Sequence, residues 1–274
     1  MAKWNRASSG LRNIIHPIVL LLTKTRVKYR IIMGKAPELL PNKPIVFAVN
    51  HTNSFDIPIA AKAISHSFLR RCYVLLGKQP LWLSDRLFFF LNGVIWVDRK
   101  SKQEMSLVKN QIIDYLKGNQ SIMWFPEGTW NLTDNLLMLP MKWGIIDVAS
   151  KAGAQIVPVV LDYDRQAMTC HVRFGSPMAP DETADKADAI RDLRDTMATL
   201  RWDQWEKQGM LRRDEIDPEA LRKDIFAALE EYPPLDWEYE KTIIFRPYTS
   251  PKDVFSHLED LIPCRENAFL WKKD

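Results

Sequence analysis

Ile45-Val-Phe-Ala-Val-Asn-His51-Thr-Asn-Ser-Phe-Asp56 is the stretch around which the chain is organised. Its first five residues are apolar and are bounded by a proline and an asparagine, which is typical of a short buried strand. His51 would leave the carboxyl end of that strand, and Asp56 would fall just before or inside a helix over 57–65. If the residues between them curl back, the carboxylate can bind one ring nitrogen while the other accepts a proton. Such a pair is equipped to act as a general base towards a hydroxyl.

Short apolar runs alternate with helical patterns through the middle of the chain. Further strands are predicted at 72–76, 93–97, 121–125 and 156–161, with an edge strand at 170–174. Helices are predicted at 79–91, 101–117 and 142–151, with one or two more over 183–208. The alternation predicts an α/β fold with a largely parallel central sheet flanked by helices.

Polar residues directly follow three of the predicted strands. They are His51, Arg99 and Glu127. The carboxyl ends of parallel strands lie on one edge of a sheet, where open α/β sheets bind their ligands. We therefore expect these three side chains to converge on one site.

Composition restricts the classes of function. The 274 residues are 46% hydrophobic, which is enough for a sizeable core. The three cysteines are widely spaced and form no CxxC pair, so we expect no disulfide framework, no metal site and a reduced compartment.

The net charge of +4 is unevenly placed. No acidic residue precedes Glu38, whereas eight lysines and arginines do, which indicates an anionic partner. The apolar run Ile14–Leu22 is too short to cross a hydrocarbon core, which takes about 20 residues. It is typical of a segment in the membrane interface, although a helix packed on the core is the alternative. No recognition fold accompanies the charge, so nucleic acid is not an expected partner.

Three regions are predicted from these patterns. Residues 1–39 form a basic, amphipathic helical arm that contacts a membrane, residues 40–208 form the domain with the candidate site, and residues 209–274 form a mostly helical C-terminal extension. The expected location is the cytoplasmic face of a membrane, with peripheral or monotopic attachment.

Residues 40–175 resemble the glycerolipid acyltransferases, typified by 1-acylglycerol-3-phosphate acyltransferase. Four blocks carry the resemblance in the family's order: Asn50-His51-x4-Asp56, Gly93-Val-Ile-Trp-Val-Asp-Arg99, Phe125-Pro-Glu127-Gly128-Thr129 and Ile156-Val-Pro158-Val. The spacing of the blocks makes the match much more specific than a lone His-x4-Asp.

The resemblance implies a reaction and a set of site residues. A fatty acyl group would pass from acyl-CoA or acyl carrier protein, as substrate, to a hydroxyl of a lyso-glycerolipid in phospholipid biosynthesis, with no further cofactor. The implied catalytic residues are His51, as base, and Asp56, which orients it. The implied substrate-binding residues are Arg99, Glu127, Gly128, Thr129 and Lys142. Backbone N–H groups near Gly128 or Asn50 are candidates for binding the oxyanion.

Two positions depart from the family pattern. Trp130 stands where the family usually has arginine, and Trp143 stands where it tends to have lysine. Three alternatives to lysophosphatidic acid acylation therefore stay open: an acyltransferase with a non-phosphorylated acceptor, a catalytically silent lipid-binding or scaffold protein, and a thioesterase that uses water.

Overall fold

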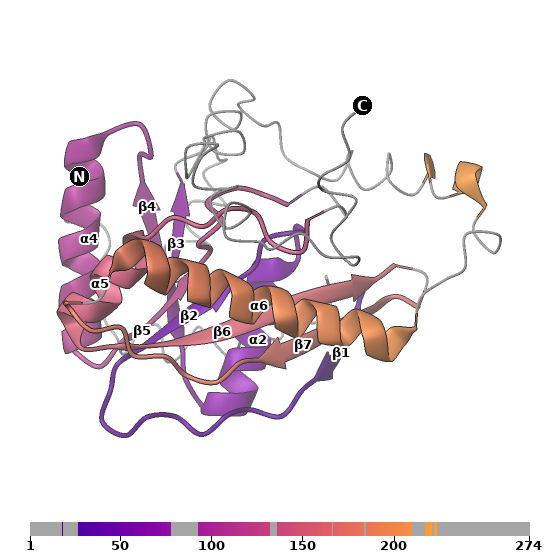
Figure 1. Cartoon of the computed structure of the whole chain (residues 1–274), viewed down its shortest axis with the longest axis horizontal. Helices are drawn as coiled ribbons and strands as arrows, with labels where there is room; N and C mark the ends of the chain where they lie inside the picture. Colours follow the sequence, from indigo (N-terminus) through magenta and orange to yellow (C-terminus); the bar gives the residue numbers. More distant parts are fainter. Residues whose placement is uncertain are drawn as a thin grey trace, which may run out of the picture. The chain divides into compact units, whose positions relative to one another are not determined.

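The computed structural model of the chain describes residues 18, 27–77, 93–131, 136–165, 167–183, 185–209, 217–220 and 222–223, all within the compact unit Met1–Pro234. The described residues form a seven-stranded sheet (Figure 1). Its strands are β1 (Arg30–Met33), β2 (Ile45–Val49), β3 (Cys72–Gly77), β4 (Val94–Val97), β5 (Ser121–Trp124), β6 (Gln155–Asp164) and β7 (Thr169–Phe174). The order is β1-β7-β6-β2-β5-β3-β4, and all neighbours are parallel except β6 and β7. The predicted α/β class with a largely parallel sheet is confirmed.

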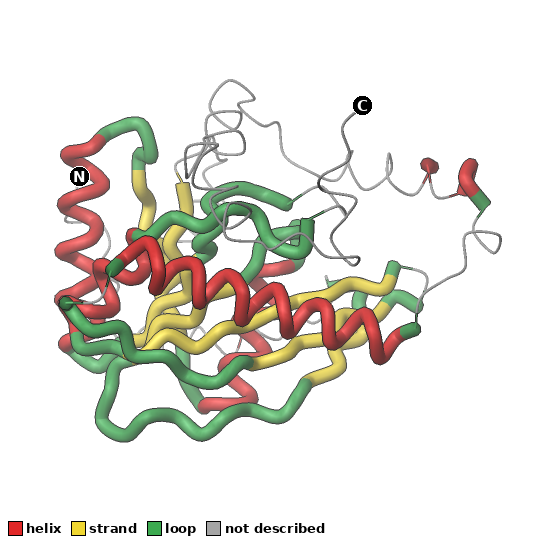
Figure 2. The backbone as a smooth tube through the Cα atoms, viewed as in Figure 1, coloured by secondary structure: helices red, strands yellow, loops and turns green. Residues whose placement is uncertain are grey.

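The helices, drawn in red in Figure 2, begin and end where local hydrogen bonds favour a helix end. They are α2 (Asp56–Phe68), α4 (Lys102–Lys117), α5 (Gly144–Ala152) and α6 (Lys186–Gln208). The Ser101 side chain accepts a hydrogen bond from the backbone N–H of Glu104 at 3.2 Å, which caps α4. The Asp185 carboxylate caps α6 in the same way, at 2.7 Å from the N–H of Ala187. A left-handed glycine with φ of 61°, Gly153, ends α5.

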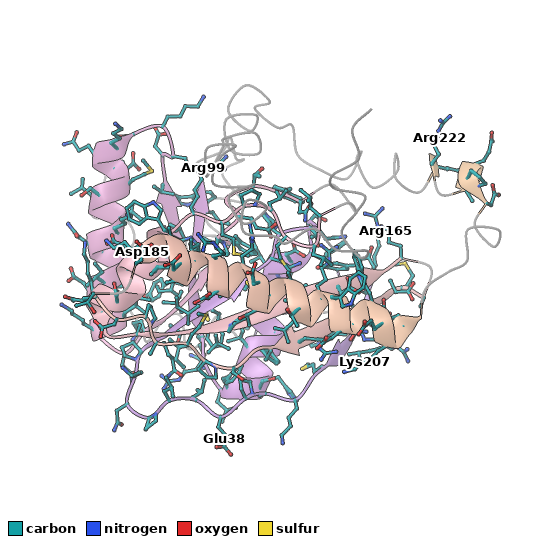
Figure 3. All side chains as sticks on the ribbon, in the orientation of Figure 1. Glu38, Arg99, Arg165, Asp185, Lys207 and Arg222 are labelled. Atoms are coloured by element: carbon teal, nitrogen blue, oxygen red, sulfur yellow. The ribbon has the colours of Figure 1, made fainter. Side chains whose placement is uncertain are left out.

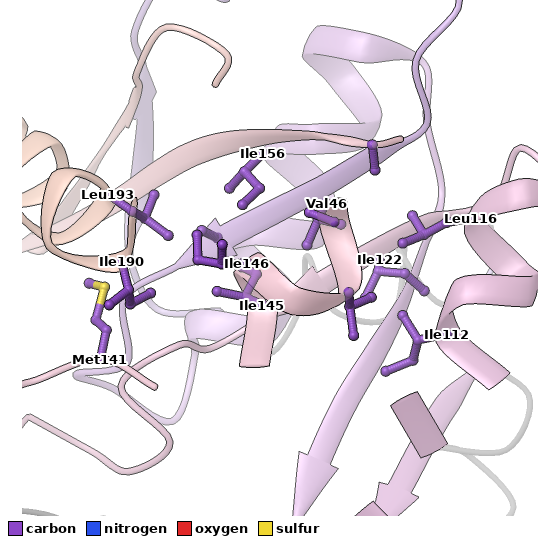
Figure 4. Packing of buried hydrophobic residues seen from close by; sticks show 14 of the residues in the cluster. Val46, Ile112, Leu116, Ile122, Met141, Ile145, Ile146, Ile156, Ile190 and Leu193 are labelled. Atoms are coloured by element: carbon purple, nitrogen blue, oxygen red, sulfur yellow. The ribbon is translucent and has the colours of Figure 1, made fainter. Parts of the chain in front are cut away.

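Helices cover both faces of the sheet because side chains alternate along each strand. In β2, Val46 and Ala48 belong to a core shared with residues of α4, α5 and α6, which lie on one face (Figures 1 and 4). Ile45, Phe47 and Val49 point the other way, into a core shared with α2. Every residue of β2 is buried, so the removal of this apolar surface from water fixes the central strand and hence the position of the residues that follow it.

The prediction of an edge strand at 170–174 is wrong, because β1 pairs outside β7. The alternation itself is real: Cys170, Val172 and Phe174 are buried, whereas His171 and Arg173 are partly exposed. β1 lies within residues 1–39, so the end of the region predicted as a separate arm contributes a strand to the sheet.

Several predicted segments fall outside the described residues. They are the helix at 79–91, the arm before residue 27 except Ile18, and the extension beyond residue 223. Among the described residues, no helix combines the length and the apolar character needed to cross a membrane.

Candidate active site

His51 and Asp56 meet at the carboxyl end of β2. His51 Nδ1 lies 2.8 Å from Asp56 Oδ2, and Asp56 is the first residue of α2. The same oxygen accepts hydrogen bonds from the backbone N–H groups of Thr52, at 2.6 Å, and Asn53, at 2.8 Å. These bonds curl the intervening residues around the carboxylate, as the spacing predicted. Asp56 is completely buried, whereas the His51 side chain is 12% exposed, so only the histidine of the pair is reachable by a ligand.

Asn50 fixes the point at which the chain leaves the sheet. Its side-chain Oδ1 accepts from the backbone N–H of Leu161 at 2.8 Å, and its Nδ2 donates to the Leu161 carbonyl at 3.0 Å. The side-chain amide thereby makes the pair of hydrogen bonds to β6 that a backbone group would make, just beyond the last residue of β2. All four of these polar groups are buried and paired, which is the condition for a stable buried polar contact.

Two aromatic rings pack against the His51 imidazole. The ring centroid of Phe125 lies 4.5 Å from that of His51, and the centroid of Trp130 lies 4.3 Å away. The backbone N–H of Asn131 also donates to the His51 carbonyl at 2.7 Å. Trp130, which stands where the family has arginine, therefore lies directly against the candidate base.

Glu127 binds the backbone on both sides of the site. Its Oε1 accepts from the N–H of His51 at 3.0 Å, and its Oε2 accepts from the N–H of Leu139 at 2.8 Å. The residue is fully buried, and burial raises its pKa from 4.5 to about 7, against the lowering effect of the two N–H groups and of Arg201. Glu127 thus ties the histidine segment to the loop around Leu139.

Two cationic side chains flank Gly128. Arg99, which is labelled in Figure 3, follows β4. It donates through Nη1 to the Gly128 carbonyl. A Cβ added to Gly77 would lie 2.8 Å from Arg99 Nε, so a glycine at the end of β3 leaves room for the guanidinium. A Cβ on Gly128, which has φ of +72°, would lie 3.5 Å from Lys142 Nζ. Arg99, Glu127 and His51 therefore share one sheet edge, as predicted, with Lys142 and the buried Thr129 beside them.

Residues 31–162 match the sequence profile of the family described as Acyltransferase. A 1-acyl-sn-glycerol-3-phosphate acyltransferase of Saccharomyces cerevisiae is 28% identical over 207 residues, which cover 68% of this chain and 66% of that protein. The lyso-ornithine lipid O-acyltransferase of Pseudomonas aeruginosa is 23% identical over 128 residues, 47% of this chain and 46% of that protein. These similarities support membership of the glycerolipid acyltransferase family. The chain spans less than two thirds of the length of either of these relatives.

The fold of the chain is also similar to a solved structure. The crystal structure of the 1-acyl-sn-glycerophosphate acyltransferase from Thermotoga maritima aligns with a TM-score of 0.53 and 15% sequence identity. The alignment covers 74% of this chain and 83% of that chain. At this identity the likeness concerns the fold alone.

Trp143, the second departure from the family pattern, is half exposed at the start of α5. Its ring is approached by the ammonium groups of Lys109, at 4.8 Å from the centroid, and Lys186, at 5.1 Å. Lys109, on α4, and Lys186, on α6, are therefore close enough to the indole ring for cation–π contacts.

The candidate oxyanion donors named from the sequence are already engaged. The N–H of Gly128 donates to the Phe125 carbonyl at 3.1 Å, and the N–H groups of residues 51–53 bind Glu127 or Asp56. Within the part of the chain that the structure describes, no group of three or more His, Cys, Asp or Glu side chains is arranged to hold a metal ion.

Sequence reasoning missed Tyr163, whose hydroxyl donates to Asp56 Oδ1 at 2.6 Å. The predicted strand stopped at residue 161, but β6 continues to Asp164. Tyr163 therefore lies at the carboxyl end of a strand parallel to β2, on the edge that holds His51. The same strand-end rule finds Tyr163 once β6 is given its full length.

Proposed function

We propose that this acyltransferase transfers a fatty acyl group from a thioester, acyl-CoA or acyl carrier protein, to the free hydroxyl of 1-acylglycerol-3-phosphate. The observation that carries the proposal is the 2.8 Å contact between His51 and the buried Asp56, on the same sheet edge as Arg99. The name of the relative in yeast agrees with this acceptor.

The bond to Asp56 occupies Nδ1 of His51, which leaves Nε2 to take the proton of the acceptor hydroxyl. The hydroxyl oxygen attacks the thioester carbonyl, and the tetrahedral intermediate expels the thiolate, which receives the proton back from the imidazolium. Asp56 stabilises the imidazolium while it exists. The hydroxyl of the acceptor is itself the nucleophile, so no covalent acyl-enzyme is needed.

Arg99 and Lys142 are the side chains we assign to the phosphate of the acceptor. A guanidinium offers a planar pair of donors that suits phosphate, and an ammonium adds a second positive charge. Glu127 and Gly128 support the site indirectly: Glu127 binds the backbone of His51, and the Gly128 carbonyl holds the guanidinium of Arg99. Thr129 is buried next to them.

A peripheral position at the cytoplasmic face of a membrane fits the acceptor and the basic N-terminal region. Lys28, Arg30 and Lys35 are exposed around β1, and Ile18 is helical and 54% exposed. A truncation for the test has to spare β1, so the variant is deletion of residues 1–26. We expect it to lose co-sedimentation with anionic vesicles; undiminished sedimentation would assign attachment to another region.

The central test measures thioester consumption and lipid products for the native chain and for His51→Ala, with 1-acylglycerol-3-phosphate as acceptor. Loss of the base is expected to lower the rate by about 10²–10⁴-fold. His66→Ala is the matched control, because His66 is an exposed histidine in the last turn of α2, and it should keep native activity. Equal turnover by native and His51→Ala would contradict the mechanism.

The products separate the remaining candidates. Acylated lipid supports the transferase, free fatty acid supports a thioesterase, and no turnover by the native chain with any acceptor supports a lipid-binding or scaffold protein. A non-phosphorylated acceptor is favoured by one observation, the indole of Trp130 against His51 where the family has a cation. Lyso-ornithine lipid is therefore the second acceptor to assay, with Trp130→Arg to test whether that position sets the preference.

A further inference from the structure

The carboxylate of Asp56 has two oxygens with different partners. Oδ2 binds His51 Nδ1 and the N–H groups of Thr52 and Asn53. Oδ1 accepts from the hydroxyl of Tyr163 at 2.6 Å. That distance is in the range of a hydrogen bond from a hydroxyl to an ionised carboxylate, which is among the stronger hydrogen bonds in proteins.

Tyr163 is held so that its hydroxyl stays on Asp56. The Tyr29 ring packs edge-on against the Tyr163 ring, with centroids 4.9 Å apart and planes at 72°. Tyr29 in turn contacts Phe55, the residue before Asp56, at 5.9 Å. The Asn50 side chain binds both backbone groups of Leu161, two residues before Tyr163. The tyrosine is therefore fixed from its ring and from its own strand.

Tyr163 also keeps its proton. Burial, and then the neighbouring charge of Asp56, raise the pKa of Tyr163 well above its ordinary value of 10.0. The hydroxyl thus keeps the proton that it donates to Asp56.

We propose that Tyr163 is a positioning residue of the acyl transfer: its hydroxyl orients the Asp56 carboxylate towards His51 and takes up part of the carboxylate's charge. This inference rests on the proposed function of the His51–Asp56 pair. Without the hydroxyl, Oδ1 loses its donor and the carboxylate attracts a proton on the imidazole more strongly. The protonated His51 ring then loses its proton less readily to become the neutral base, and the ring is less well oriented.

Other titratable groups near Asp56 also have to be considered in the pH dependence of the reaction. His51 follows β2, Glu127 follows β5, Tyr163 lies on β6 and Cys170 lies on β7. Burial raises the pKa of the Cys170 thiol far above its ordinary value, so it stays neutral. Glu127, with its pKa of about 7, titrates in the range of interest and is common to the native chain and the variant.

The experiment compares the pH profile of kcat/KM for acyl transfer in the native chain, Tyr163→Phe and Tyr115→Phe. Tyr115→Phe removes a hydroxyl that accepts a bond from Gln111 on α4, and serves as the matched control. For Tyr163→Phe we expect kcat/KM to fall about tenfold, the typical effect of losing a hydrogen bond to a charged group. We also expect the acidic limb of its profile to move up by about half a unit to one unit.

The outcomes are distinct. A Tyr163→Phe profile with native midpoints, lowered only in proportion to the folded fraction seen by circular dichroism, would overturn the proposal and leave Tyr163 a packing role. A shift of the same size in Tyr115→Phe would also overturn it. If His51→Ala turns over like the native chain, the proposed function itself has failed. If His51→Ala is inactive but Tyr163→Phe behaves like the native chain, the proposed function stands and the positioning role of Tyr163 is wrong.

Discussion

Two regions of the molecule are built around an aspartate with several partners, and the partners differ in kind. At the sheet edge, Asp56 is bound by two backbone N–H groups, one tyrosine hydroxyl and one imidazole. On α5, Asp147 is bound by three ammonium groups, those of Lys109 at 3.3 Å, Lys151 at 3.2 Å and Lys186 at 2.7 Å. The Asp56 carboxylate is thus bound by two backbone groups, a hydroxyl and a ring nitrogen, whereas the Asp147 carboxylate is bound by ammonium groups.

The pKa shifts in the two regions run in opposite directions. Burial raises the pKa of Glu127, beside His51, to about 7. Burial also acts to raise the pKa of Asp147, but the hydrogen bonds of Lys186 and Lys151 and the charge of Lys109 outweigh it and lower the pKa to about 2. At the sheet edge, Glu127 can therefore gain or lose a proton near neutral pH. In the lysine cluster, the Asp147 carboxylate stays charged and links α4, α5 and α6 through its three lysines.

The largest difference between the regions should appear when each aspartate becomes asparagine. Asp56→Asn removes the charge that orients and stabilises the imidazolium, so we expect kcat for acyl transfer to fall by about 10³–10⁴-fold. Asp147→Asn should leave kcat within about twofold of native, since its partners Lys109, Lys151 and Lys186 are assigned neither to the base nor to the phosphate of the acceptor. Steady-state kinetics of the two variants measure this difference, with kcat calculated per folded protein. Similar losses of kcat in both variants would contradict a catalytic role that is special to Asp56.

Glu127→Gln tests whether the buried carboxyl group of Glu127 makes the stability of the protein depend on pH. The folded-state pKa of about 7 exceeds the ordinary 4.5, so the folded chain binds more protons between these values. The free energy of unfolding should therefore fall as pH rises from about 4.5 to 7, by about 3 kcal/mol from this group. Urea unfolding at pH 5 and pH 8 measures this slope. Glu127→Gln should flatten it, and an unchanged slope in the variant would assign the pH dependence to other groups.

The elements that sequence predicted well are those with a local signature. The buried strand at Ile45–Val49 follows from an unbroken apolar run, and α4 follows from the Ser101 cap and the spacing of Val108, Ile112 and Leu116. The convergence of His51, Arg99 and Glu127 follows from one rule about parallel strand ends, so it needed no atomic detail.

What sequence did not predict depends on contacts between distant segments. β7 alternates like an edge strand, and only the pairing of Arg30–Met33 beside it makes it internal. Tyr163 lies 107 residues from Asp56, and no spacing rule connects them. Glu127 was assigned to the acceptor from its motif alone, whereas its two oxygens bind backbone groups that only the folded chain brings together.

The smallest expected effect is on the stability of the lysine cluster. The Asp147 carboxyl has its folded pKa lowered from 3.8 to about 2, so its contribution is present above pH 4 and is lost as pH falls towards 2. Because the three lysine side chains are 31–54% exposed, the solvent-screened contribution is about 1–2 kcal/mol.

Asp147→Asn should lower the free energy of unfolding by that amount at pH 7, and the loss should shrink in 1 M salt because the uncompensated lysines repel each other less when screened. Asp195→Asn removes a carboxylate paired with Arg194 on the exposed side of α6, where both side chains are at least 42% exposed, and should change stability by less than about 0.5 kcal/mol. Urea unfolding at low and high salt separates the two variants. If the loss in free energy of unfolding of Asp147→Asn did not change with salt, the carboxylate would stabilise α5 through packing. The two regions would then differ mainly in burial and less in electrostatics.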